Sequence, residues 1–179
     1  MFRPAGESDS ESSEASYEDR LDPPVQHRDC RVEACEERDV SLLSDLSLAV
    51  EAGDVEAVME SLSSVPVNCK LSVWRWGEVT PAGLAALYAQ DEVLQLLLEK
   101  GGDCNAEGFI LLASADWDCD QEKVVRCGHL IAGLDNEDIN RAKSEGLTPL
   151  MIASSNGNRF LVQWLVEQGA KLDLQDTFR

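Results

Sequence analysis

The chain has 179 residues, and its 34 acidic and 15 basic side chains give a net charge of -19 at pH 7. This length suits one ordinary domain with a tail. The acidic charge argues against nucleic acid or anionic membranes as partners, because binding to either relies on clustered Lys and Arg, and it favours basic proteins or basic peptide segments.

Targeting and membrane signals are weak in this sequence. No apolar run reaches the roughly 18 residues of a membrane-spanning helix. Residues 1–6 lack the apolar core of a signal peptide. We therefore expect a cytoplasmic protein, with membrane attachment only through parts that lie outside this sequence.

Residues 1–39 are expected to form a disordered acidic tail. The stretch 7–14 contains only Ser, Asp and Glu, and Pro23-Pro24 would break a helix. Ser8 and Ser16 each precede an acidic residue by three positions, an arrangement that acid-directed kinases favour. Phosphorylation would add about -1.5 to -2 charges per site and strengthen attraction to a basic partner.

From Val40 onward the apolar residues recur at helical spacing. Residues 46–52 are expected to form one helix, Gly53-Asp54 a turn, and residues 55–59 a second helix. This helix–turn–helix unit would occupy residues 40–69.

Two later segments, residues 70–105 and 142–176, share a clearer pattern. Each contains a Thr-Pro step, at Thr80 and Thr148, in which the Thr hydroxyl caps a helix and Pro takes the first helical position. Each then has an apolar helical stretch that ends at Gly. This pattern resembles the ankyrin repeat. Since the two Thr-Pro steps lie 68 residues apart, a third, irregular repeat of about 33 residues fits between them, at 106–141.

The resulting prediction is an all-α ankyrin-repeat solenoid of about four helix-turn-helix repeats with hairpin fingers, after the disordered tail. Stacked repeats share a continuous core. Because the sequence ends where another repeat would begin, we expect a truncated array with apolar residues of the last repeat, including Leu161, partly exposed. Self-association through that end is an open alternative. Trp164 lies on the helical stripe and is expected in the core.

The ankyrin resemblance implies binding through the fingertips and the first helix of each repeat, which line the concave side. The register places two residues in the finger between the first two repeats. It places a further pair at the first helix of each of repeats two, three and four. The candidate partner-binding residues are Trp74, Trp76, Leu87, Tyr88, Asp116, Trp117, Ser155 and Asn156. Exposed aromatic clusters mark interaction sites. The alternative for Trp74 and Trp76 is packing over the end of repeat one, and for Trp117 packing within its loop.

A catalytic, metal or cofactor site is not expected. Neither His27 nor His129 has an obvious partner, and no phosphate-binding glycine loop or nucleophile motif occurs. The six cysteines do not have zinc-site spacing, so reduced thiols are expected. No small-molecule substrate is implied.

The order of features over residues 40–179 resembles a particular family. A Ser- and acid-rich start is followed by Ala-Val-Glu-Ala-Gly-Asp-Val at 49–55, an irregular third repeat with Cys127, and a regular fourth repeat. This is similar to the germ-cell ankyrin, sterile-alpha-motif and leucine-zipper family (GASZ). Ala82-Gly83 departs from the usual Leu-His of the ankyrin repeat, which puts the first helix of repeat two in doubt.

That resemblance implies a scaffold of the germline piRNA pathway. Such a protein would recruit partner proteins to germ granules (nuage) at the mitochondrial outer surface and support transposon silencing. The alternative is a generic cytosolic ankyrin regulator that inhibits or positions a partner enzyme. RNA binding and a structural spacer without a partner are two further hypotheses.

Overall fold

The computed structural model describes residues 37–105, 107–116, 119–134 and 138–177. Helix α1 (Glu37–Ala52) begins within the last residues assigned to the acidic tail. The rest of the expected tail, residues 1–36, lies outside the described residues. Among the described helices, none has both the length and the apolar composition needed to cross a bilayer.

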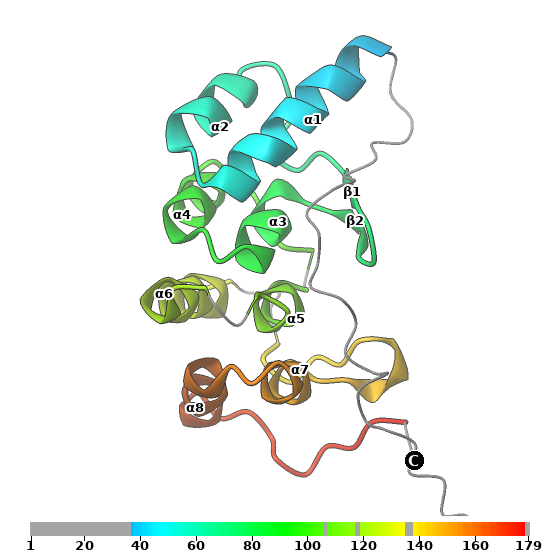
Figure 1. Cartoon of the computed structure of the whole chain (residues 1–179), viewed down its shortest axis with the longest axis vertical. Coiled ribbons are helices and arrows are strands. Elements are labelled where there is room, and N and C mark those ends of the chain that lie inside the picture. Colours follow the sequence, from blue (N-terminus) through cyan, green and yellow to red (C-terminus); the bar gives the residue numbers. More distant parts are fainter. Residues whose placement is uncertain (1–36, 106, 117–118, 135–137, 178–179) are drawn as a thin grey trace, which may run out of the picture.

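The described residues form eight α-helices in two layers (Figure 1). The inner layer stacks α1, α3, α5 and α7, and the outer layer stacks α2, α4, α6 and α8. Each inner helix also packs on the outer helix that follows it. This arrangement confirms the ankyrin-repeat solenoid. The helices after α1 are α2 (Val55–Ser61), α3 (Pro81–Leu87), α4 (Asp91–Glu99), α5 (Gly108–Ala113), α6 (Gln121–Ala132), α7 (Pro149–Ser155) and α8 (Arg159–Glu167).

Fingers project beside the inner layer, on the side away from the outer helices (Figure 1). Strands β1 (Leu71–Val73) and β2 (Gly77–Val79) form an antiparallel hairpin before α3. A shorter turn with one 3₁₀ segment, η2 (Ser144–Gly146), precedes α7. Both fingers therefore lead into the N-terminal end of an inner helix.

The Thr-Pro steps start α3 and α7 as the sequence predicts. The Thr80 hydroxyl accepts a hydrogen bond from the Gly83 amide at 3.1 Å, and the Thr148 hydroxyl accepts one from the Met151 amide at 3.3 Å. Pro follows each cap at the start of the helix. Such a cap contributes about 1 kcal/mol to stability.

The departure at Ala82-Gly83 does not disturb α3. Both residues are buried, and a Cβ added at Gly83 would lie 2.9 Å from Cδ1 of Leu111 on α5. A side chain at this position would require the buried Leu111 side chain to shift, so glycine suits the packing of α3 on α5. The first helix of repeat two therefore forms despite this departure from the usual repeat pattern.

The expectation that Leu161 is partly exposed is also wrong. Helix α8 turns Leu161 toward the core, where it is 1% exposed, with Trp164 at 5%. The outward positions of the same helix carry Phe160, which is 51% exposed, and Val166. The apolar stripe of an amphipathic helix explains the difference, since positions three to four residues apart share a face.

Candidate functional site

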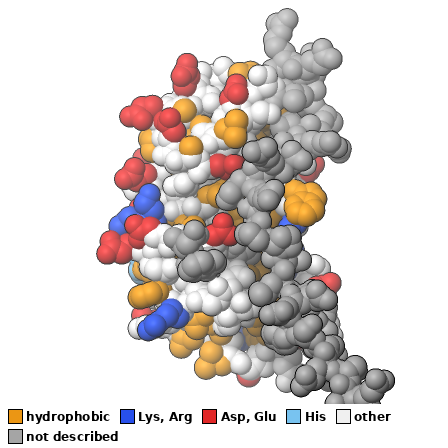
Figure 2. Space-filling view, viewed as in Figure 1, with side chains coloured by type: hydrophobic (Ala, Val, Ile, Leu, Met, Phe, Trp, Pro, Cys, Tyr) orange, Lys and Arg blue, Asp and Glu red, His pale blue; other side chains and the backbone are white. Residues whose placement is uncertain are grey.

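The turn of the β1–β2 hairpin presents its two tryptophans differently. Trp74 is 75% exposed, whereas Trp76 is half-buried and packs against the core. Arg75 between them adopts the left-handed region at φ 75°, and the Trp76 amide donates to the Val73 carbonyl at 3.0 Å. The tight turn therefore holds one indole out in solvent and the other against the protein. Figure 2 shows a hydrophobic side chain projecting from the edge where the hairpin lies.

Trp76 contacts the finger that precedes α7. The ammonium nitrogen of Lys143 lies 3.8 Å from the centroid of the Trp76 ring. A cation at this distance is attracted by the negative face of the ring. The contact joins the finger before α3 to the finger before α7. These two fingers belong to repeats that are not neighbours in sequence.

The finger before α7 has a turn like that of the first hairpin. The Gly146 amide donates to the Lys143 carbonyl at 3.1 Å, and the Lys143 amide donates to the Leu147 carbonyl at 2.9 Å. Glu145 adopts a left-handed φ of 79°. Its carbonyl accepts hydrogen bonds from the amide and the hydroxyl of Thr177, at 2.8 and 3.0 Å. Lys143 is therefore held in a hydrogen-bonded turn.

The remaining candidate residues lie at the other end of the inner helices. Leu87 ends α3, Tyr88 follows it, and both are half-buried against the core. Asp116 follows α5 and is exposed, as are Ser155 at the end of α7 and Asn156 after it. Trp117 lies outside the described residues.

The described candidates therefore fall in two places: the two tryptophans at one fingertip, and the others at the C-terminal ends of three inner helices. Helix α3 has seven residues, and its rise of about 10 Å separates the fingertip from Leu87 and Tyr88. The assignment of these residues to the partner-binding side stays a prediction. Trp74 and Trp76 are the two described candidates that lie in a finger.

Asn156 has a structural role that the sequence reasoning missed. Its amide nitrogen donates to the Ala113 carbonyl of α5 at 3.0 Å. Gln90, at the start of α4, donates from its amide nitrogen to the Glu51 carbonyl of α1 at 2.8 Å. Each side chain hydrogen-bonds a carbonyl in the last turn of the inner helix of the repeat before it. Asn156 therefore links two neighbouring repeats.

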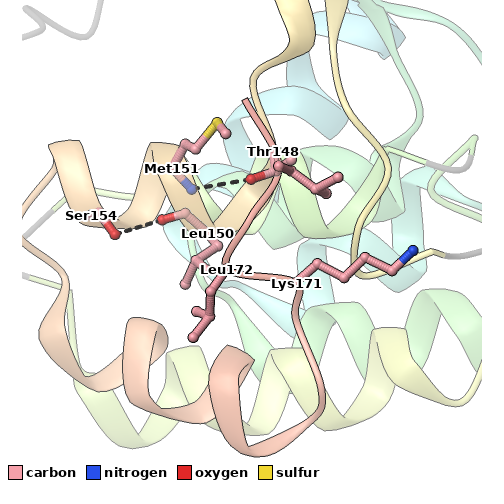
Figure 3. A pocket seen from close by; sticks show the side chains of 7 residues that line it. Thr148, Leu150, Met151, Ser154, Lys171 and Leu172 are labelled. Carbon is pink, nitrogen blue, oxygen red and sulfur yellow. Dashed lines mark hydrogen bonds between the residues drawn. The ribbon is translucent and has the colours of Figure 1, made fainter. Parts of the chain in front are cut away.

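A separate hollow of about 370 Å³ lies between α7 and the chain segment that follows α8 (Figure 3). The Ser154 hydroxyl donates to the Leu150 carbonyl at 2.7 Å, and the Thr148 hydroxyl is used as a cap. Leu150 and Leu172 lie side by side in Figure 3, while Lys171 extends away from them. This lining suits packing against apolar groups better than acid–base chemistry. The residues that line it are Thr148, Leu150, Met151, Ser154, Lys171, Leu172 and Leu174.

The titratable groups that could suggest chemistry have structural roles. His129 Nε2 accepts a hydrogen bond from Trp164 Nε1 at 3.2 Å. Burial raises the pKa of the Cys127 thiol to about 12, with a further contribution from the Asp91 carboxylate. A thiol with this pKa is a poor nucleophile at neutral pH. Within the described parts of the chain, no three His, Cys, Asp or Glu side chains gather in a metal-binding group.

Comparison with known proteins points to ankyrin repeats. The family model "Ankyrin repeat" matches residues 145–177, which include the end of the finger before α7, α7 and α8. The chain is 28% identical over 161 residues to "Ankyrin repeat, SAM and basic leucine zipper domain-containing protein 1" of Callithrix jacchus, covering 88% of this chain and 32% of that protein.

Proteins with the same name in two other mammals give similar values. The match in Saimiri boliviensis boliviensis is 28% identical over 161 residues, again 88% of this chain and 32% of the relative. The match in Dasypus novemcinctus is 30% identical over 127 residues, 69% of this chain and 26% of the relative. The chain thus spans at most about a third of the length of these curated relatives.

Proposed function

We propose that this ankyrin-repeat protein, a distant relative of the ankyrin repeat, SAM and basic leucine zipper proteins, is a protein-binding scaffold. Its binding side would be the one that carries the fingers. The observation behind this proposal is Trp74, an indole that is 75% exposed at the tip of a hydrogen-bonded hairpin. A tryptophan offers a large apolar area at low cost in conformational entropy, and it is among the residues that most often dominate binding energy.

The proposed setting is the germline piRNA pathway. The protein would recruit partner proteins to germ granules at the mitochondrial surface, within the cytoplasm, and so support transposon silencing. The support is the family resemblance together with similarity over 88% of the chain. We further propose the domain division into an acidic tail, residues 1–39, and an ankyrin domain, residues 40–179. The four repeats would be 40–69, 70–105, 106–141 and 142–176.

The proposal is tested by capture from germline lysate, followed by mass spectrometry. The three baits are the whole chain, Trp74→Ala and Phe160→Ala. Phe160 is an exposed aromatic residue on the outer helix α8, so it is a matched control away from the fingers. All baits must first give the same circular dichroism spectrum.

We expect the whole chain and Phe160→Ala to retain a common partner that Trp74→Ala loses. Equal capture by all three baits would contradict a binding site at the fingertip. If the captured partner is an enzyme whose activity falls when the chain is added, the protein acts as a regulator instead of a passive scaffold.

A further inference from the structure

The contact between Trp76 and Lys143 shows that this ring face accepts a cation. The ammonium lies 3.8 Å from the ring centroid. The Trp76 amide is tied to the Val73 carbonyl, and the ring packs partly against the core, so its face has a fixed orientation. A preorganised aromatic face loses little entropy when it binds a cation.

Trp76 is also next to the most exposed aromatic residue of the fingers. Trp74 stands two positions away on the same turn and projects into solvent. Since Cα atoms two positions apart are at most about 7 Å apart, an extended segment of about three residues spans the distance between the two tryptophans. The pair combines a cation-binding face with an apolar contact, and this combination suits a basic side chain with an apolar neighbour.

The charge of the molecule favours the same kind of segment. The chain has a net charge of -19. Exposed carboxylates of Glu78 and Glu145 belong to the two fingers that the contact joins, although Arg75 and Lys143 lie in the same turns. The overall field attracts a basic segment, and the aromatic pair gives it a defined position.

We propose that the face of Trp76 binds an arginine or lysine side chain from an extended basic segment of a partner protein. Lys143 would occupy this face in the free protein. This inference rests on the proposed scaffold function and names the chemistry of its partner. The side chain of Lys143 is then an internal competitor that the partner must displace. Removing it should therefore tighten binding, whereas removing an ordinary contact residue would weaken it.

The test is fluorescence anisotropy with a labelled ten-residue peptide in which Arg and Ser alternate. A peptide with Gln in place of Arg is the neutral control. The protein variants are Lys143→Ala and Arg159→Ala, made in the whole chain. Arg159 is an exposed cation at the start of α8, so its loss changes the net charge equally at a site away from the fingers. Neither substitution removes a core side chain.

We expect the Arg peptide to bind better than the Gln peptide. Lys143→Ala should tighten binding of the Arg peptide by about two- to five-fold more than Arg159→Ala does, which is the range that loss of one cation–π contact implies. Unchanged or weaker binding by Lys143→Ala would overturn the inference, as would equal gains in both variants or equal binding of the two peptides.

The failure of this inference is distinguishable from that of the proposed function. If the peptide results are negative while germline capture still depends on Trp74, the scaffold proposal stands and the cation-binding site is wrong. If Trp74→Ala captures the same partner as the whole chain, the fingertip proposal itself fails.

Discussion

The ring of Trp164 lies directly over Gly128, and this contact fixes how α8 sits on α6. A Cβ added at Gly128 would be 2.9 Å from Cη2 and Cζ3 of that ring. Phe109 lies 6.1 Å away between ring centroids, and the His129 ring meets Trp164 edge-on at 5.2 Å. The indole is thus held on three sides, and glycine provides the room on one of them.

Gly128→Ala should therefore destabilise the protein. Overpacking costs about 1–3 kcal/mol, and the gain in helix propensity of about 1 kcal/mol offsets part of it, so the free energy of unfolding should fall on the order of 1 kcal/mol. Urea unfolding measures this change. Gly133→Ala is the matched control at the end of α6, where the nearest atom to an added Cβ is 3.4 Å away. Equal stability of the two variants would contradict the packing account.

Cys127 makes stability depend on pH in the alkaline range. Its pKa is raised from 9.0 to about 12 in the folded protein, first by burial and then by the Asp91 carboxylate. The folded state thus retains a proton that the unfolded state loses. The resulting stabilisation is complete below pH 9 and is lost as pH rises from 9 to 12.

Cys127→Ala should show that the thiol stabilises the folded protein less as the pH rises. At pH 7.5 the variant should be less stable, by about 1 kcal/mol for a small cavity. This deficit should shrink as the pH is raised to 10.5. Over that range the parent protein loses part of the stabilisation that comes from the Cys127 thiol, whereas the variant has no thiol at this position. Urea unfolding at the two pH values tests the prediction. A deficit that stays constant or grows would show that the thiol is not buried in the manner described.

At the scale of elements, α4 and α6 are joined by an ion pair. Asp91, buried in the first turn of α4, accepts from Arg126 Nε, and Lys123 Nζ lies 3.9 Å from its other oxygen. The N-terminus of α4 also stabilises a carboxylate. Removal of the main cation would leave a largely buried charge less compensated.

Arg126→Met keeps the apolar stem and should lower the urea midpoint. Glu122→Ala removes a highly exposed carboxylate from the same cluster and should leave the midpoint unchanged. The double variant Asp91→Asn with Arg126→Met should lose less stability than the two single variants together, because the buried charge is gone. Additive losses would mean that the ion pair does not couple the helices.

Most of the helices and repeats could be predicted from the sequence. The Thr-Pro caps and helical spacing identified the repeats, and helix α6 (Gln121–Ala132) falls where the irregular repeat was expected. These signals act within one repeat, so local patterns reveal them. The periodicity also implied a buried stripe on α8 but did not show that Leu161 is covered.

Contacts between repeats could not be predicted in this way. Lys143 and Trp76 belong to different fingers, and no local pattern links them. The use of Asn156 as a bond between repeats was missed for the same reason. The candidate residues were assigned by their position in a repeat, and their place in the partner-binding side stays a prediction.

For the whole molecule, the two layers present distinct surfaces. Figure 2 shows acidic side chains gathered over the edge formed by α2 and α4, where Glu56, Glu60, Glu92 and Glu99 are exposed. The fingers lie on the other side, with an exposed indole. In this account the acidic field brings a basic partner near, and the fingertip determines where it binds.

The most direct test of this account is the dissociation constant of the captured partner, measured by calorimetry with the parent protein and with Trp74→Ala. A hot-spot tryptophan contributes about 2 kcal/mol, so Trp74→Ala should weaken binding about 30-fold. Phe160→Ala should bind like the parent protein. A dissociation constant for Trp74→Ala equal to that of the parent, with the fold intact, would contradict a binding site at the fingertip.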